Sequence, residues 1–168
     1  MIDFLYVFNS SVVKVQRNQY IREIAVVQKA YRFTLDIKPT GTKKGWTNVF
    51  RATATPTKNC CSYGNRVPAI FFRSDTSKLH ICNSINGRGN FYIDEMIPMD
   101  KYTTVTIQQL RNEDGKYRYT ILLDHKEAYT VINNKPQVFK NVQVFFGDRF
   151  YQPSEAMIKN FLFQNLEG

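Results

Sequence analysis

The residue types that could do chemistry gather between Asn59 and Asn90, in the segment NCCSYGNRVPAIFFRSDTSKLHICNSINGRGN. It contains all three cysteines, one of the two histidines and three of the eight glycines of the chain. Such residues can bind zinc, act as nucleophile or base, form disulfides or shape a phosphate-binding loop. The spacing of the residues decides among these chemistries.

The spacing argues against a zinc site and against nucleophilic catalysis. Neither a Cys-x-x-Cys pair nor a His-x-x-x-His pair is present. His80 alternates with Leu79 and Ile81, which is typical of an exposed or hydrogen-bonded strand histidine. No G-x-S-x-G elbow or P-loop occurs. A strand pattern follows the glycines of Ile85–Asn90, so we expect them to allow positive φ in a tight loop and not to cradle a phosphate.

The three cysteines leave two redox states open. Cys60 and Cys61 are adjacent and are not expected to bond to each other, whereas either one could reach Cys82 across the loop and hairpin. That disulfide would leave the third cysteine as a free thiol or as one that bonds to another molecule. The alternative is three reduced, partly buried thiols in a cytosolic protein.

The carboxylates do not form the pairs that carbohydrate-active enzymes need. Asp94-Glu95 and Glu113-Asp114 are adjacent, and neighbouring strand residues point to opposite faces. Neither pair can therefore flank one glycosidic bond, and we predict a non-enzymatic protein. We find no calcium motif in the sequence, and we expect Asp148 in Gly147–Phe150 to form an Asx-type turn.

Hydrophobic periodicity predicts an all-β fold of about ten short strands. Apolar residues alternate with polar ones, and turn signals recur between the runs. The expected strands are 31–38, 46–54, 67–73, 78–82, 91–93, 103–111, 117–124, 127–132, 142–146 and 157–163. This pattern is typical of an antiparallel β-sandwich or barrel spanning 1–168 as a single domain. Residues 1–24 are assigned to edge strands that close the sandwich, with the N- and C-terminal strands side by side.

Composition indicates a folded, basic protein, whose charge either serves acidic partners or is simply that of a soluble basic protein. Hydrophobic residues make up 43% of the 168 residues, which suits a domain with a real core. The formal net charge of +9 favours sulfated glycans, nucleic acid or anionic lipid. Nucleic acid is not expected, because arginine-rich blocks and basic helices are lacking. No apolar run approaches the ~20 residues that span a bilayer, and the start lacks the features of a signal peptide. The chain is therefore expected to be cytosolic, or a fragment without its leader.

Aromatic and arginine side chains are the candidate binding residues. Six aromatic residues could stack on sugar rings, namely Trp46, Tyr63, Tyr92, Tyr129, Phe150 and Tyr151. Tyr63 and Tyr151 are preferred because both lie in polar loops. Arginine beside tyrosine suits sulfate, carboxylate or protein contacts. The predicted ligand-binding residues are Tyr63, Asn65, Arg66, Arg88, Arg149 and Tyr151.

Four segments resemble the laminin-G-like, or concanavalin A-like, jelly-roll domains of animal extracellular proteins. They are YRFTLDIKPTG with GWTNVFRAT, NCCSYGNRVPAIFF with KLHICNSINGRGN, YTTVTIQQL with YRYTILLDHKEAYTV, and NNKPQVFKNVQVFFGDRFYQPSEAMIKNFLFQN. The last segment is the most specific, and the resemblance covers about residues 25–166. It implies an extracellular module that binds glycans, heparin-like polymers or proteins through rim loops, in some members with calcium. It also favours the disulfide, assigned to Cys61 and Cys82 with Cys60 as the alternative partner.

The sequence therefore predicts a non-enzymatic extracellular recognition domain for a glycan, acidic or sulfated among the options, or for a protein surface. One alternative is a protein–protein adhesion or receptor ectodomain module without sugar binding. The other is a carbohydrate-active enzyme. No cofactor is expected.

Overall fold

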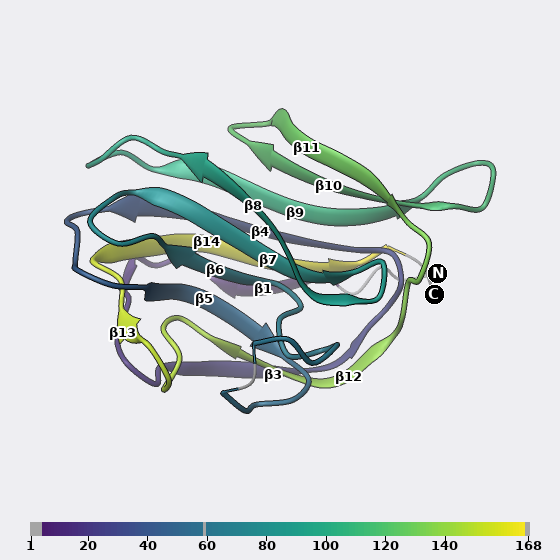
Figure 1. Cartoon of the computed structure of the whole chain (residues 1–168), viewed down its shortest axis with the longest axis horizontal. Helices are drawn as coiled ribbons and strands as arrows, with labels where there is room; N and C mark the ends of the chain where they lie inside the picture. Colours follow the sequence, from purple (N-terminus) through teal and green to yellow (C-terminus); the bar gives the residue numbers. More distant parts are fainter. Residues whose placement is uncertain (1–4, 59, 167–168) are drawn as a thin grey trace.

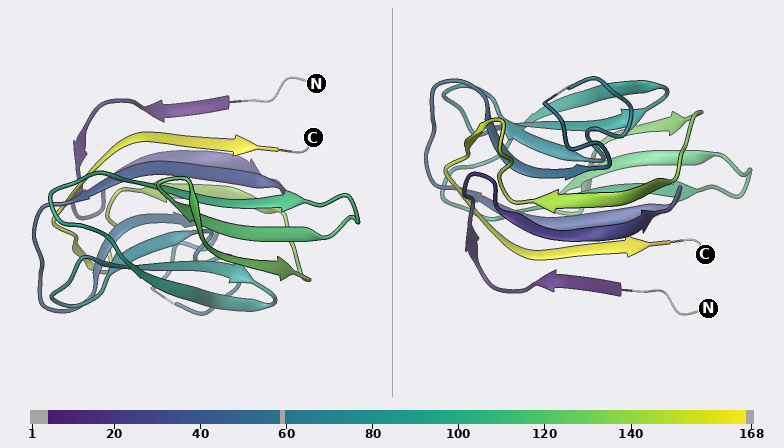
Figure 2. Two further views of the ribbon diagram at one scale, coloured as in Figure 1. Left: turned by 90° about the horizontal axis from the view of Figure 1, so that it is seen from above. Right: turned by 90° about the horizontal axis from the view of Figure 1, so that it is seen from below.

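Two stacked antiparallel sheets make up the computed structural model, which describes residues 5–58 and 60–166 (Figures 1 and 2). The first sheet has the order β1-β14-β4-β9-β10-β11, with β2 paired to β14. Its strands are β1 (Leu5–Asn9), β2 (Val13–Lys14), β4 (Tyr31–Pro39), β9 (Thr103–Arg111), β10 (Tyr117–Leu123), β11 (Lys126–Asn133) and β14 (Ala156–Asn165).

The second sheet has the order β3-β12-β5-β6-β7-β8, with the short β13 lying parallel to β5. Its strands are β3 (Tyr20–Val27), β5 (Thr47–Thr53), β6 (Ala69–Phe72), β7 (Lys78–Ile85), β8 (Arg88–Met96), β12 (Phe139–Phe145) and β13 (Gln152–Pro153). Among the described residues there is no helix, and so none that could cross a membrane.

The core lies between the sheets and follows directly from the period-2 pattern. In β4, Phe33, Leu35 and Ile37 are fully buried, while the residues between them are half-buried. Phe33 packs against Phe50 of the second sheet with ring centroids 6.1 Å apart. Since each sheet turns one apolar face to the other, burial of these side chains holds the layers together.

The predicted all-β sandwich is confirmed, and the expected strands recur with shifts of a few residues at their ends. β1 pairs with β14, so the terminal strands do lie side by side, as Figure 2 shows. β3 has no counterpart among the ten expected strands, but it starts within the residues 1–24 assigned to edge strands and pairs with β12 at an edge of the second sheet. Its apolar residues Ile21, Ile24 and Val27 are three apart, so the period-2 pattern does not mark it as a strand.

The β7–β8 hairpin sets the geometry of the site. Asn86 and Gly87 both have positive φ, 54° and 76°, as a two-residue hairpin turn requires. Gly89 is different from what the sequence suggested. It is not among the residues with positive φ, but a Cβ there would lie 2.2 Å from the carbonyl oxygen of Cys61. Glycine at this position therefore lets the cysteine loop lie against the start of β8.

Candidate functional site

A hollow of about 280 Å³ lies on the outer face of the second sheet, over β6, β7 and β8. Leu79 and Ile81 of β7 point into the core, so the alternating His80 and Cys82 point outward. Phe71 and Tyr92 reach the same face from the neighbouring strands. The lining residues are Trp46, Cys60, Arg66, Phe71, Arg73, His80, Asn90, Tyr92 and Tyr151.

Arg66 is a nearly buried cation in this hollow. The residue lies in the chain between the cysteine loop and β6, and it is only 5% exposed. One guanidinium nitrogen donates to Asn90 Oδ1 at 2.7 Å, and the other donates to the Tyr151 hydroxyl at 3.4 Å. Its Nε has no partner, and no carboxylate pairs with it among residues 5–58 and 60–166. Because a buried charge is normally paired, this arrangement suits a negatively charged ligand group.

A second arginine is held at the rim by a carboxylate. Arg73 donates from Nε and Nη2 to Asp94 Oδ2, at 3.0 and 2.7 Å. Its guanidinium also lies 4.7 Å from the Trp46 ring centroid. Asp94 itself does not line the hollow, so the lining carries two guanidinium groups and no carboxylate. Because Asp94 neutralises Arg73, the unpaired positive charge of the hollow is that of Arg66.

His80 sits at the floor of the hollow and is held by the same carboxylate. Its Nδ1 lies 2.8 Å from Asp94 Oδ1. Burial lowers the pKa of His80, although the hydrogen bond to Asp94 opposes that shift. Burial alone would raise the pKa of Asp94, but the bonds from Arg73 and His80 outweigh it and hold that pKa below its usual value. The imidazole is thus neutral at pH 7, with its proton on Nδ1 facing the ionised carboxylate.

Three aromatic rings stand around the charged groups. Trp46 and Tyr92 are 39% and 50% exposed, unusually open for large rings. Both contact His80, with ring centroids 4.8 and 4.4 Å apart. Tyr151 packs on Phe71 at 5.0 Å from the opposite side. Exposed rings beside guanidinium groups can stack on sugar rings while the charges bind acidic substituents.

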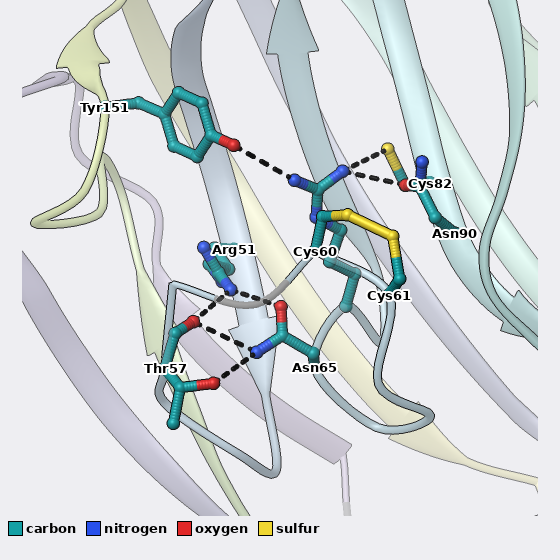
Figure 3. Close-up of a disulfide and its surroundings, with 9 residues drawn as sticks. Arg51, Thr57, Cys60, Cys61, Asn65, Cys82, Asn90 and Tyr151 are labelled. Carbon is teal, nitrogen blue, oxygen red and sulfur yellow. Dashed lines mark hydrogen bonds between the residues drawn. A yellow bond between two sulfur atoms is a disulfide. The ribbon is translucent and has the colours of Figure 1, made fainter.

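The disulfide differs from the one predicted. Cys60 bonds to Cys61, and Cys82 is a free, buried thiol (Figure 3). Cys82 lies in the middle of β7 under the Arg66 guanidinium, whose Nη1 is 3.5 Å from its sulfur. The predicted Cys61–Cys82 bond is therefore wrong: Arg66 already occupies the outer side of Cys82. Cys60 lines the hollow, so the disulfide-bonded loop forms part of its wall.

Buried polar residues hold that loop in place (Figure 3). Arg51, 1% exposed, forms an ion pair with Asp148 at 2.9 Å and donates to the Thr57 carbonyl at 3.0 Å. Asn65 accepts a hydrogen bond from Arg51 and donates to the Thr55 carbonyl at 2.7 Å. These bonds tie the segment before the disulfide to β5, so the wall of the hollow is braced from below.

The six predicted ligand-binding residues do not form one cluster. Arg66 and Tyr151 meet in the hollow, although 85 residues separate them. Asn65 is fully buried and fixes the loop, so it offers no surface to a ligand. The Tyr63 hydroxyl donates to the Lys135 carbonyl at 3.0 Å, and Arg88 is exposed at the start of β8; neither lines the hollow. Arg149 lies in a separate hollow described below.

Sequence reasoning missed the residues contributed by the face of the sheet. Trp46 and Tyr92 are candidates for sugar stacking but not among the six predicted ligand-binding residues, and Arg73 and Asn90 belong to neither set. The sequence does contain a usable signal in its period-2 alternation. His80 lies between the apolar Leu79 and Ile81, and Tyr92 and Asp94 lie on either side of Ile93. The predicted Asx-type role of Asp148 is confirmed, since its Oδ1 accepts the amide hydrogens of Phe150 and Tyr151.

Within residues 5–58 and 60–166, no group of three or more His, Cys, Asp or Glu side chains is placed to hold a metal ion. Calcium, which the resemblance allows, remains untested. Asp94 is bound to Arg73 and His80, and its register partner is His80, while Glu95 pairs with Leu79. The two adjacent carboxylates thus lie on opposite faces, as expected from their spacing.

No protein-family model and no curated protein sequence matches the chain. Solved structures of the same fold are found at low identity. The heptameric SAP-like pentraxin from Limulus polyphemus has a TM-score of 0.59 at 13% identity, over 92% of this chain and 76% of the pentraxin. The carbohydrate recognition domain of Emp47p has 0.56 at 10%, over 97% and 88%. Endo-β-1,4-glucuronan lyase from the fungus Trichoderma reesei has 0.56 at 9%, over 96% and 79%. The chain thus has the jelly-roll sandwich fold of lectin-like proteins.

Proposed function

We propose that this chain is a non-enzymatic, extracellular recognition module that binds an acidic glycan in the hollow over β6, β7 and β8. The observation that carries the proposal is Arg66, a nearly buried guanidinium that faces the hollow without a carboxylate partner among the described residues. A carboxylate or sulfate on a sugar would complete its charge. This places the ligand on the sheet face and not at the rim loops suggested by the sequence.

The surroundings of Arg66 support a sugar as the carrier of that anion. Trp46 and Tyr92 offer exposed ring faces, and Arg73, although paired with Asp94, supplies further guanidinium N–H donors at the rim. Asn90 and Tyr151 fix the Arg66 guanidinium, so little rotational freedom is lost on binding. The pentraxin and the Emp47p domain share the fold, which is consistent with recognition but names no ligand. The Cys60–Cys61 disulfide favours an oxidising, extracellular setting.

A glycan-binding assay with charge-matched variants tests the proposal. Wild-type protein is measured against heparin, chondroitin sulfate and polygalacturonate, with a neutral glucan as the reference. Binding is expected to the acidic polymers only and to weaken with salt. Arg66→Gln removes a charge-assisted contact worth about 1.5–3 kcal/mol, so we expect an affinity loss of about tenfold or more. Arg118→Gln, the same charge change at an exposed residue of β10 in the other sheet, should lose far less affinity.

Because Arg66 is buried, Tyr92→Ala serves as a second variant that leaves the core intact. The glycan proposal fails if the Arg66→Gln and Tyr92→Ala proteins bind as well as the Arg118→Gln protein. It also fails if no acidic glycan binds at low salt.

The same experiment separates the two alternatives. A protein-binding module is favoured by the exposed Trp46, Tyr92 and arginines, which are the residue types that dominate protein interfaces. That alternative predicts no binding to any glycan. An enzyme would use the neutral His80 as a base. Incubation with a uronate polymer would then release unsaturated ends, seen as new ultraviolet absorbance, and this result would overturn the non-enzymatic assignment.

A further inference from the structure

A second hollow, also of about 280 Å³, lies on the same face of the sheet over β5 and β12. Ala52 of β5 and Val144 of β12 point into the core, so their neighbours point outward. The lining residues are Asn18, Arg51, Thr53, Pro56, Gln143, Phe145, Asp148, Arg149 and Phe150. The strand order β12-β5-β6-β7-β8 places this hollow directly beside the first one.

The second hollow carries one available positive charge. Arg51 is neutralised by Asp148, with Nη1 and Oδ2 2.9 Å apart. Arg149 is exposed and pairs with no carboxylate in the part of the chain that is described; its Nη2 donates only to the Pro56 carbonyl at 3.2 Å. The Arg149 guanidinium lies 4.8 Å from the Phe150 ring centroid. As in the first hollow, an unpaired guanidinium lies beside an aromatic ring, although Phe150 is half-buried.

One carboxylate fixes the two hollows relative to each other. Asp148 Oδ1 accepts the amide hydrogens of Phe150 and Tyr151, at 3.0 and 2.9 Å. These consecutive rings point into different hollows, Phe150 into the second and Tyr151 into the first. The boundary between the hollows is therefore a rigid turn, held at its base by the buried pair of Arg51 and Asp148.

We infer that the ligand is a linear acidic polysaccharide that crosses the strands and occupies both hollows at once. This rests on the proposed function of the first hollow. β12 and β8 are four strand spacings apart, about 19 Å at ~4.8 Å each. Such a span suits several linked sugars, whose repeating negative charges would meet Arg66 at one end and Arg149 at the other. A single terminal acidic sugar would fill only one hollow.

Size-defined heparin oligosaccharides test this inference in a titration with the full chain. Wild type should bind longer oligosaccharides more tightly than the disaccharide. Arg149→Gln should lower the affinity for the long oligosaccharides by about tenfold, the value of one charge-assisted contact, and leave the disaccharide unaffected. Phe150→Ala should act in the same direction. Arg66→Gln should weaken binding at every length. Arg118→Gln should change neither the affinity for the disaccharide nor the affinity for the long oligosaccharides.

Longer oligosaccharides contain more overlapping binding sites, so an affinity that rises with length does not by itself support two hollows. The deciding quantity is the ratio of the Arg149→Gln affinity to the wild-type affinity at each length. If that ratio is the same for the disaccharide and the longest oligosaccharide, the two-hollow inference is wrong, while binding at the first hollow stands. If no acidic oligosaccharide of any length binds wild type, the proposed function fails and the inference with it.

Discussion

His80 and Asp94 face each other across the β7–β8 pair, with Nδ1 and Oδ1 2.8 Å apart. The carboxylate holds the imidazole at the floor of a hollow whose lining contains Arg66 and Arg73. Burial lowers the pKa of His80, and the two arginines add to that effect. An anion bound in the hollow would act in the opposite direction, because it favours the imidazolium.

Glycan affinity is therefore expected to depend on pH through His80. The free protein holds His80 neutral, and the anionic ligand raises its pKa, so binding takes up a proton. Affinity for a sulfated glycan, whose own charge is constant, should rise as pH falls through the pKa that His80 has in the complex. His80→Asn should abolish the rise, and His125→Gln, at the other, exposed histidine, should keep it. Titration calorimetry between pH 5 and 8 would measure it.

Stability of the free protein supplies an independent check of the sign. The pKa of His80 is lower in the folded protein than in the unfolded chain. Its contribution to the free energy of unfolding is therefore present above about pH 6.5 and is lost as pH falls through the folded-state pKa. Wild type should lose more thermal stability than His80→Asn over that interval. Equal losses, together with pH-independent glycan binding, would show that His80 does not titrate as described.

Removing Asp148 should destabilise the protein strongly. Asp148→Ala would leave the Arg51 charge buried without its partner, which costs about 3–5 kcal/mol of unfolding free energy. The change also removes the acceptor for the amides of Phe150 and Tyr151. Asp114→Ala, which breaks an exposed pair with Lys116, should cost only about 0–1 kcal/mol. Urea denaturation would compare the two, and similar small losses would contradict a buried role for Asp148.

Gly89→Ala should disturb the site without disrupting the core. The new Cβ would lie 2.2 Å from the Cys61 carbonyl oxygen, so the disulfide-bonded loop must move away from β8. We expect a clear loss of glycan affinity with the circular dichroism spectrum retained. Gly41→Ala, whose Cβ would be 3.3 Å from Glu155 Cβ, is the matched control and should bind nearly as wild type. Unchanged affinity in Gly89→Ala would mean that the loop does not shape the hollow.

The cysteines should be distinguishable by chemical labelling. Burial raises the pKa of the Cys82 thiol to about 12, so alkylation in the native state should be slow. After unfolding without reductant, one cysteine per chain should react, and peptide mapping should place the label on Cys82. Mass spectrometry should find Cys60 and Cys61 linked within one peptide. Labelling of Cys60 or Cys61 before reduction would contradict the disulfide.

The amino-acid sequence determined the fold because alternating hydrophobicity is a local property. Residues Tyr31 to Ile37 show which face of β4 is buried, and the same reading predicted most other strands. The turn chemistry of Asp148 could also be read locally, because an Asx turn involves only the next few residues. β3 has no counterpart among the ten expected strands, because its apolar residues do not alternate with polar ones.

Only the tertiary structure decided which side chains form the site. Ile85 pairs with Arg88 next to the hairpin turn, and continuing that register would put Ile93 opposite His80. An irregularity between Asn83 and Ile85 shifts the register by one and brings Asp94 there instead. Likewise, Arg66 and Tyr151 meet because β5 brings the cysteine loop and the Asp148 turn together. Sequence encodes each residue's face, but pairing register and loop packing depend on long-range contacts that no local pattern contains.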